Sequence, residues 1–467
     1  METGRRSILF GSPNTYVVRN WLASGLADRC RADLGLEPVF VTPFQDAAFS
    51  SPAGAAYANH GLPIARRKDV ELPIGFPRLL FFFWYLRMRT FAREVPNGSL
   101  QMMMLAQRRD IVHYAAEAVR RLAPRGSRVR RMLRSAIDAI NPRDPVCNEL
   151  LARLRPEIVV VGSPGVMYID QVLMVEAQRL GIPVHCVVNS WDNLTSRGPM
   201  MRRPDRLMVW NRHMAEQAAT IHEFPADRTV IVGALQFTEY GESPAQSECV
   251  AVRERVGLAA DAKFLLYLTG QHAPEYEAED VAALLHALEG SEFGEMSVVV
   301  RVHPQASVGP FRAIRHPRLV VDVAPRYASS GANGLSFDHR EMRAMSALLA
   351  SSEAVLASWA TTGLLEAAIF DRPVVQLRWM DSIAHSVEEQ RQKIEALQTY
   401  EHLKAFDAVG SRLFSDDPAD VVAQLRRQSD DAELFRQRRR RAVDELAMLP
   451  LTDAPDRIVE CLRNGPV

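Results

Sequence analysis

Short apolar segments that end in small or polar residues, each followed by a stretch of helical character, recur along most of this chain. The apolar segment Ala354–Ser358 shows the pattern clearly, because a turn of threonine and small residues, Trp359–Gly363, follows it. Leu364–Phe370 then favours a helix, and Val374–Leu377 is a second apolar segment. This order predicts a strand–helix–strand unit whose helix begins at a polar turn, an arrangement that binds anions.

Length and composition limit the classes of protein to consider. The chain has 467 residues, 47% hydrophobic and 24% charged, as in a soluble globular protein of two or three domains. Its 56 basic and 56 acidic residues balance, so no nucleic-acid partner is expected. Its five cysteines form no C-x-x-C pair, which argues against structural zinc and favours a reducing, cytoplasmic setting. The longest apolar run, Leu79–Leu86, is too short for a membrane-spanning helix.

A first strand–helix alternation occupies residues 1–240. We expect its strands at Ser7–Ser12, Pro38–Phe44, Pro156–Gly162, Val184–Ser190, Pro204–Trp210 and Thr229–Leu235. Helical stretches at 16–34, 166–180 and 211–222 separate them, which predicts a parallel sheet. The loop Gly11–Asn14 follows the first strand, where open α/β sheets bind ligands, so Asn14 is a candidate site residue. No G-x-G-x-x-G fingerprint is present.

Residues 45–150 interrupt this alternation and are expected to form a helical insertion. One interpretation is that these helices pack on the sheet domain and turn their arginines to solvent. The alternative is a surface that meets a lipid-linked acceptor or an anionic membrane, through the aromatic and arginine residues of segment 77–93.

A second alternation follows a polar stretch, 241–262, that we interpret as a linker. In residues 263–450 the further strands are expected at Lys263–Gly270, Met296–Pro304 and Arg318–Val323. Helices are expected at 281–289, 341–349, 383–398 and 418–447, and residues 451–467 carry a last short helix. The basic run Arg436–Arg441 is interpreted as a solvated helix face.

Several short motifs resemble those of GT-B glycosyltransferases, especially bacterial surface-polysaccharide transferases and CDP-glycerol glycerophosphotransferase-like enzymes. The motifs are VVRVHP at 299–304, ASWATTGLLEAAIFDRPVVQL at 357–377 and NSWDNLTSRG at 189–198. PDRLMVWN at 204–211 and VGALQF at 232–237 extend the likeness. The resemblance implies an α/β fold with two Rossmann-like domains facing a central cleft. Two Rossmann domains of another kind, as in an epimerase or a dehydrogenase, are the alternative.

The resemblance also implies a reaction. A nucleotide-sugar donor would bind the C-terminal domain as a substrate, with no metal or other cofactor. A glycan or lipid-linked acceptor would bind the N-terminal domain, in capsule or O-antigen (lipopolysaccharide) biosynthesis. The setting would be the cytoplasm, at the inner face of the membrane.

The polar turn before Leu364 supplies the expected donor-binding residues. Thr361, Thr362 and Gly363 lie where hydroxyl and amide groups would face phosphate oxygens. Glu366 is four residues after Thr362 on the same helix face, and the resemblance implies that it accepts hydrogen bonds from ribose hydroxyls. The alternative is that the threonines cap the helix and Glu366 is a surface residue.

Two further strand ends carry polar residues on the donor side. Arg301 and His303 alternate along a strand and point to one side, so both could reach a diphosphate. His303 would be protonated or donate a hydrogen bond, which makes it a candidate catalytic residue as well. Gln271 and His272 follow another strand and are expected to line the same site.

Asp192 is the candidate general base that an inverting transferase needs. Trp191 could stack on a sugar or lower the local dielectric, and Asn193 would lie beside it. Alternatively, Asp192 and Asn193 shape the loop as an Asx-type turn, and in a retaining enzyme Asp192 would only bind substrate. Asp170 and His60 are weaker candidates for the base.

Three other functions remain open from the sequence. A polyol-phosphate transferase would use a CDP-linked donor. A non-catalytic scaffold of the same fold would keep the nucleotide site without a base. A nucleotide-binding epimerase would also bind a nucleotide sugar.

Overall fold

The computed structural model forms two compact units. Unit 1 is Met1–Gln236 together with Asp453–Val467, and unit 2 is Phe237–Thr452. The residues that the structure describes are 6–12, 15–43, 57–62, 64–67, 70–73, 111–122, 127–129, 132, 144–164, 168–196, 200, 202–270, 274–304, 306–323, 339–359, 361–378 and 400–464.

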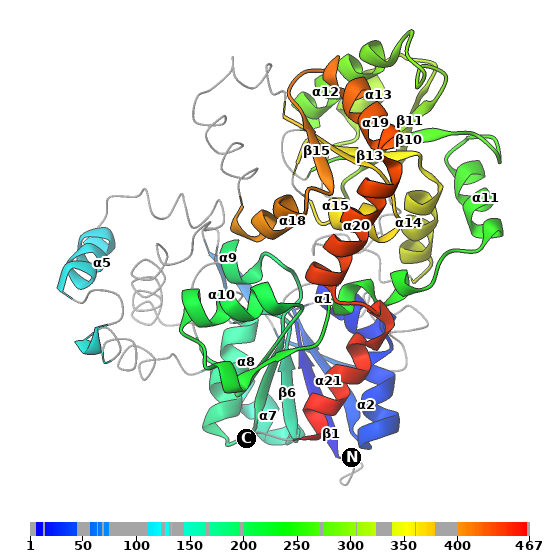
Figure 1. The fold of residues 1–467 in the computed structure, drawn as a ribbon. Helices are drawn as coiled ribbons and strands as arrows, with labels where there is room; N and C mark the ends of the chain where they lie inside the picture. The colour runs from blue at the N-terminus through cyan, green and yellow to red at the C-terminus, as the bar shows by residue number, and fades with distance from the viewer. Residues whose placement is uncertain are drawn as a thin grey trace. The chain divides into compact units, whose positions relative to one another are not determined.

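Unit 1 is built on a seven-stranded parallel sheet with the order β3-β2-β1-β6-β7-β8-β9 (Figure 1). The strands are β1 (Ser7–Gly11), β2 (Glu37–Thr42), β3 (Ala58–Gly61), β6 (Ile158–Val161), β7 (Val184–Val187), β8 (Arg206–Val209) and β9 (Thr229–Ile231). The helices are α1 (Thr15–Ala23), α2 (Leu26–Leu34), α5 (Ile111–Leu122), α7 (Pro145–Leu154), α8 (Tyr168–Arg179), α9 (Asn193–Ser196), α10 (Arg212–His222) and α21 (Ala454–Arg463). A separate antiparallel pair joins β4 (Ile64–Arg67) and β5 (Val70–Pro73).

Unit 2 contains a six-stranded parallel sheet with the order β12-β11-β10-β13-β14-β15. The strands are β10 (Phe264–Leu268), β11 (Ser297–Val302), β12 (Leu319–Val323), β13 (Ala354–Ala357), β14 (Val374–Leu377) and β15 (Arg412–Ser415). The helices are α11 (Gln246–Arg255), α12 (Pro274–Leu288), α13 (Gly309–Ala313), α14 (His339–Ser351), α15 (Gly363–Ile369), α18 (Lys404–Val409), α19 (Asp420–Asp430) and α20 (Ala432–Ala447). Across both units, segments of 3-10 helix are Ala226–Arg228, Leu235–Gly241, Glu401–Leu403 and Leu451–Asp453.

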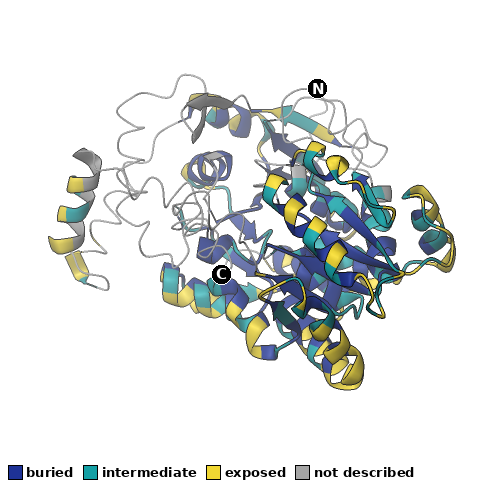
Figure 2. Ribbon diagram, turned by 90° about the horizontal axis from the view of Figure 1, so that it is seen from above, coloured by how far each residue is buried: buried dark blue, intermediate teal, exposed yellow. Residues whose placement is uncertain are grey.

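Hydrophobic burial explains why the apolar segments become strands. β6, β7, β10, β13 and β14 are buried along their whole length, as expected for parallel strands covered on both faces. Figure 2 shows the inner strands mainly in the colour of buried residues, and many exposed residues on the outward turns of helices. The predicted strands and the alternation of strand and helix are therefore confirmed. The helix expected at 16–34 is two helices, because Gly25 takes a left-handed φ of 73° between them.

The segment expected to be a linker, 241–262, differs from that expectation because it contains helix α11, which packs on α14. Cys249 and Val252 of α11 are buried, and Glu248 forms an ion pair with Arg343 of α14 at 2.6 Å. Two buried positions among many polar ones leave too weak an apolar pattern to predict a helix. The segment belongs to unit 2, and the chain crosses between the units at Gln236 and again at Thr452.

The C-terminal helix α21 belongs to unit 1 and lies beside α2 (Figure 1). Ile458 and Leu462 of α21 are buried, and Asp456 forms an ion pair with Arg29 of α2. The helix expected within 451–467 is confirmed, and it completes the first domain.

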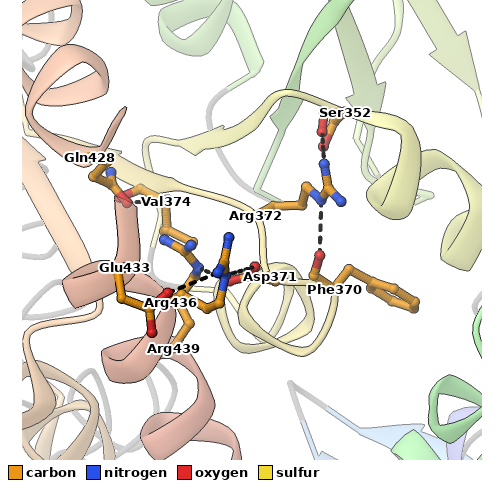
Figure 3. A network of polar contacts seen from close by, with 9 residues as sticks. All are labelled: Ser352, Phe370, Asp371, Arg372, Val374, Gln428, Glu433, Arg436 and Arg439. Carbon is orange, nitrogen blue, oxygen red and sulfur yellow. Dashed lines mark hydrogen bonds and ion pairs between the residues drawn. The ribbon is translucent and has the colours of Figure 1, made fainter. Parts of the chain in front are cut away.

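A polar network anchors the turn between α15 and β14 (Figure 3). Asp371, which has a φ of 55°, accepts hydrogen bonds from Arg439 at 2.7 Å and from Arg436 at 3.3 Å, both on α20. Arg372 donates to the carbonyl oxygens of Phe370 at 2.9 Å and Ser352 at 3.0 Å. The network ties α20 to the strand–helix–strand unit that holds the predicted donor site.

This network corrects the interpretation of Arg436–Arg441 as a solvated face. Arg439 is buried against Asp371, although Arg440 and Arg441 are exposed. A run of arginines cannot show which member turns inward, because that depends on a carboxylate 68 residues away in the chain.

Parts of the helical insertion lie outside the described residues, including segment 77–93, and the helix expected at 383–398 also lies outside them. In the described part of the insertion, α5 exposes the side chains of Tyr114 and Leu122. None of the described helices combines the length and apolar character needed to cross a bilayer.

Candidate functional site

The strand order of unit 2 reverses between β10 and β13, which defines a topological switch point. β10 is followed in sequence by β11 on one side, and β13 starts the strands on the other side. Open α/β sheets bind ligands outside the carboxyl ends of the strands at this place. The residues there are Thr269 and Gly270 after β10, and Ser358, Trp359 and the start of α15 after β13.

Two glycines let the elements at this switch point approach closely. A Cβ at Gly270 would overlap the indole of Trp359, and a Cβ at Gly363 would overlap the side chain of Leu268 on β10. The ring of Trp359 therefore lies directly over the end of β10, and α15 begins against the same strand. Close packing of Trp359 and of α15 on β10 therefore fixes the elements at this switch point.

The start of α15 presents polar groups that the protein does not satisfy. Thr362 is the N-cap residue, but its side chain makes no capping hydrogen bond, and the buried Oγ1 of Thr361 has no partner among the described residues. In the same part of the chain, the backbone N–H groups of Thr361, Thr362 and Gly363 have no acceptor. Neither threonine side chain therefore caps α15 with a hydrogen bond to a described residue, which contradicts the alternative that both serve as caps.

An unsatisfied buried hydroxyl costs about 1–3 kcal/mol. Such groups need a reason, and a ligand that accepts hydrogen bonds here would supply one. Helix α15 has only seven residues, so the hydroxyl and amide groups at its start matter more than its dipole.

Glu366 lies one helical turn after this start and is partly exposed, whereas its neighbours Leu365 and Ala367 are buried. Its backbone N–H donates to the carbonyl of Thr362 at 3.1 Å. The structure thus places the carboxylate of Glu366 on the exposed face of α15, and its ribose-binding role stays a prediction.

His303 follows β11 directly and lies next to the end of β10. Its backbone N–H donates to the hydroxyl of Thr269 at 2.8 Å, which joins the two strand ends. Because His303 follows the end of β11 and Thr361 follows the end of β13, both lie at the carboxyl edge of the same parallel sheet. The side chain of His303 is partly exposed there. Thr269 was not singled out from the sequence.

Arg301 lies on β11, two residues before His303, but its guanidinium is already engaged. It donates to Asp322 of β12 at 2.6 Å and forms an ion pair with Glu341 of α14. Although burial opposes them, these two carboxylates raise the pKa of Arg301 above its usual value. In this structure Arg301 joins β11 to β12 and α14, and its charge is already balanced by two carboxylates, so its part in binding a diphosphate stays a prediction.

Two buried acids behind the switch point were not recognised from the sequence. Glu277 of α12 accepts the backbone N–H of Gly270 with both carboxylate oxygens, at 2.9 and 3.0 Å. Asp280 accepts the hydroxyl of Ser358 at 2.8 Å, and Ser358 also bonds Tyr267 at 2.5 Å. The sequence signal was available, since two acids spaced i, i+3 after a strand end fall on one helix face.

Glu277 acts as a support for the site. Burial raises its pKa well above the usual value, although the hydrogen bond from Gly270 opposes the shift. The Nε1 of Trp359 lies near this carboxyl, but it makes no hydrogen bond of normal geometry there. The Trp359 ring is therefore fixed by packing, and its N–H is a further donor without an acceptor among the described residues.

Unit 1 has its own switch point, between β1 and β6. A Cβ at Gly11 would overlap Leu173 of α8, and a Cβ at Gly162 would overlap Val17 of α1. Asp170 is fully buried, accepts a hydrogen bond from Ser163, and has one oxygen without a partner. Burial raises the pKa of Asp170 well above its usual value, although the hydrogen bonds from Ser163 oppose the shift, and this direction weakens Asp170 as a candidate base.

The loop after β7 carries Asp192, which is partly exposed. The hydroxyl of Ser196 donates to the Asp192 carboxylate at 2.7 Å, and the Ser196 backbone N–H donates to the Asp192 carbonyl at 2.8 Å. Asn193 accepts the backbone N–H of Ser190 at 3.2 Å. None of these bonds runs from a backbone N–H two residues on to the Asp192 or Asn193 side chain, so the Asx-type turn stays a prediction, and the Asp192 side chain is partly exposed.

The neighbours of Asp192 are packed inward. Trp191 is 4% exposed, so it can lower the local dielectric but offers little ring surface to a sugar. His222 of α10 accepts the Met200 N–H at 3.1 Å and bonds the carbonyl of Leu194 at 2.8 Å. These two bonds join α10 to Leu194 of α9 and to Met200.

His60 ends up two strands away from the unit 1 switch point, on the edge strand β3. Burial, with the charge of Arg153, lowers its pKa. Asn14 and Gln271, like His272, lie outside the described residues. No group of three His, Cys, Asp or Glu side chains suited to a metal ion occurs within the described ranges.

Comparison with known proteins identifies the fold. No family model matches the chain, and no curated protein matches it in sequence. Among solved structures, it is similar to S. aureus MnaA in a co-structure with UDP (TM-score 0.54, 11% identity), which covers 98% of this chain and 96% of that one.

Two further solved structures extend this similarity. One is UDP-GlcNAc 2-epimerase from Neisseria meningitidis bound to UDP-GlcNAc (TM-score 0.52, 12% identity), a match that covers 98% of this chain and 100% of that one. The other is a glycosyltransferase from Rickettsia africae ESF-5 (TM-score 0.51, 5% identity), a match that covers 99% of this chain and 100% of that one. The chain therefore has the two-domain α/β GT-B fold.

Proposed function

We propose that this protein is a glycosyltransferase that moves a sugar from a nucleotide-sugar donor to a glycan or lipid-linked acceptor. Unit 2 binds the donor at the switch point between β10 and β13. The observation that carries the proposal is the unsatisfied hydroxyl of Thr361, next to backbone N–H groups that have no acceptor within the described residues. Solved structures of similar fold hold UDP or UDP-GlcNAc, which supports a nucleotide at this edge.

In this proposal the donor diphosphate accepts hydrogen bonds at Thr361–Gly363 and from His303, and Glu366 accepts from the ribose hydroxyls. Unit 1 holds the acceptor beside Asp192. Asp192 takes the proton of the acceptor hydroxyl, the oxygen bonds to the anomeric carbon, and the bond from that carbon to the diphosphate oxygen breaks. The electron pair leaves with the nucleoside diphosphate, whose growing charge the N–H and O–H groups stabilise.

A nucleotide-sugar epimerase is the second candidate, because two of the similar solved structures carry that fold with UDP or UDP-GlcNAc, one of them named as an epimerase. An epimerase converts its nucleotide sugar without an acceptor. A transferase consumes donor only when an acceptor is supplied, apart from slow hydrolysis. A polyol-phosphate transferase with a CDP-linked donor would release CMP rather than a nucleoside diphosphate, and a scaffold would release nothing.

Donor binding is tested by calorimetry with UDP, GDP, CDP and CMP. We expect one of them to bind, and we expect Glu366→Gln to weaken that binding about tenfold, since a charge-assisted hydrogen bond is lost. Glu353→Gln is the matched control, because Glu353 is a partly exposed acid of the same unit that forms an ion pair with Lys263. Failure of all four nucleotides to bind would reject the donor site.

Turnover then separates the candidates. Each UDP-sugar is incubated with and without a lipid-linked glycan extract, and the sugar is followed by proton NMR. Acceptor-dependent release of UDP supports the transferase, whereas a change of sugar configuration without acceptor supports the epimerase.

The proposal includes a metal-independent reaction in the cytoplasm, at the inner face of the membrane, during capsule or O-antigen synthesis. The five buried free thiols support a reducing compartment. We expect EDTA to leave the transfer rate unchanged within twofold. A rate that falls with EDTA and returns with added magnesium would contradict the metal-independent step.

A further inference from the structure

Unit 1 contains a cavity that the proposed reaction does not use. Its volume is about 510 Å³, and its lining includes Ile182, Arg202, Arg203, Asp205 and Arg228. Ile182 and Asp205 come just before β7 and β8, and Arg228 comes just before β9. All strands of this sheet are parallel, so the cavity lies at their amino ends, at the sheet edge opposite to Asp192.

The charge of the lining is unbalanced. Arg202, Arg203 and Arg228 bring three guanidinium groups to the cavity, against the single carboxylate of Asp205. One oxygen of Asp205 already accepts the backbone N–H of Val184 at 2.8 Å. Positive groups gathered around one hollow repel one another, and an anion in the hollow relieves that repulsion.

Two of the arginines are held in place by the fold. The Nε of Arg202 donates to the side-chain oxygen of Gln178 at 2.6 Å, and Gln178 donates to the carbonyl of Arg203 at 2.9 Å. Arg203 reaches the carbonyl of His222 at 3.5 Å, at the C-terminus of α10. The cavity is therefore preorganised, with little side-chain entropy left to lose on binding.

Arg228 differs from the other two. Its side chain is exposed and makes no hydrogen bond or ion pair to a described residue. It lies at the rim, where it can close over a bound ligand without leaving another partner.

We propose that this cavity is a second ligand site, for a soluble phosphate-bearing small molecule with at least two negative charges. The guanidinium fork fits phosphate oxygens with two parallel hydrogen bonds, which explains why arginines line the hollow. The volume lies within the range for small-molecule sites, and Ile182 offers an apolar wall to the organic part of the ligand. The site is separate from the proposed donor site, which belongs to unit 2.

The experiment uses inorganic pyrophosphate as the probe, with the full chain and titration calorimetry at low salt. We expect Arg228→Gln to weaken pyrophosphate binding about tenfold, through the loss of a charge-assisted hydrogen bond. The matched control is Arg212→Gln, an exposed arginine of unit 1 that pairs with Glu216 at 3.2 Å, and it should change the affinity less than twofold. Thermal melting of each variant checks that the fold is kept.

Hydrogen–deuterium exchange locates the bound probe. Pyrophosphate should slow exchange in the segment 202–206, and Arg228→Gln should remove that protection. The proposal is overturned if the wild-type chain binds no pyrophosphate, or if Arg228→Gln and Arg212→Gln weaken it equally. Binding that Arg228→Gln leaves intact and Thr361→Val removes would also overturn it, because the probe would then occupy the unit 2 edge.

Discussion

The switch points of the two sheets are closed by the same kind of packing but expose different chemistry. In unit 1, Leu173 and Val17 close over the glycines at the ends of β1 and β6. In unit 2, Trp359 and Leu268 close over Gly270 and Gly363. Each edge also has a buried carboxyl whose pKa is raised by burial, Asp170 in unit 1 and Glu277 in unit 2.

The difference lies in what these edges leave unsatisfied. At the unit 2 edge, Glu277 accepts the Gly270 N–H, and the buried groups there that lack a normal hydrogen bond to a described residue include two donors, the Thr361 hydroxyl and the Trp359 N–H. At the unit 1 edge, one oxygen of the Asp170 carboxyl group has no partner among the described residues. Unsatisfied donors suit an anion, whereas the unit 1 edge has an acceptor left over, so the two sheets share a topology but not a ligand chemistry.

Replacing Asp192 by Asn should have the largest effect and would sharpen this division. The amide cannot take a proton, so we expect the transfer rate to fall by about 10²–10⁴-fold. Nucleotide affinity should stay unchanged, because the proposed donor site lies in the other unit. Glu149→Gln, at an exposed acid on α7, is the control. A variant with near-normal turnover would remove Asp192 as the base.

Gly270→Ala tests whether the packing of the unit 2 edge is as tight as it looks. The new Cβ would meet the Trp359 ring, and overpacking of a core position costs about 1–3 kcal/mol of unfolding free energy. Gly309→Ala is the matched control, since its Cβ would meet only the Ser307 hydroxyl, at 3.7 Å. Equal denaturation midpoints for the two variants would show that Trp359 moves aside freely.

Thr361→Val should separate stability from binding. Removal of an unsatisfied hydroxyl should leave the unfolding free energy unchanged or raise it by about 1 kcal/mol, while nucleotide affinity falls about tenfold. Ser346→Ala on α14 is the control, because its hydroxyl is also buried without a partner among described residues but lies away from the strand ends. Lower stability with unchanged affinity would show that Thr361 serves the fold alone.

Asp170→Asn should give the smallest effect, visible as a change in pH dependence. The pKa of Asp170 is raised in the folded state, so between about pH 4 and that raised value the folded chain binds more protons than the unfolded chain. Stability from this group is present at low pH and is lost as pH rises. Denaturant unfolding at pH 5 and pH 8 should therefore show a smaller decline for Asp170→Asn than for the wild type. Parallel declines would mean that Asp170 ionises normally.

Much of the fold could be predicted from the sequence, because a parallel strand that is buried on both faces has a continuous apolar sequence. Val374–Leu377 matches β14 at both ends, and Ala354–Ser358 differs from β13 by one residue. β15 was missed because Arg412 and Ser415 break its apolar pattern. Their burial depends on distant partners such as Gln376, which no local pattern records.

The site was less predictable, for a related reason. The polar turn at Thr361 could be located, since it follows a clear strand. The ion pairs of Arg301 could not, because Asp322 and Glu341 lie 21 and 40 residues further on. The alternation of side chains along the strand placed Arg301 near the correct edge of the sheet. Only the fold shows that the carboxylates of Asp322 and Glu341 already balance its positive charge.

The return of the chain to unit 1 has a consequence for how the protein is made. The ribosome completes all of unit 2 before α21 emerges, because the last segment of unit 1 is Asp453–Val467. During synthesis all strands of the first sheet are made by Ile231, but the surface of α2 that contacts α21 stays uncovered until the whole of unit 2 has been made. A chain released before α21 is made would contain all of unit 2, but the surface of α2 in unit 1 that α21 covers would stay exposed. Chaperones and proteases recognise exposed surfaces of this kind.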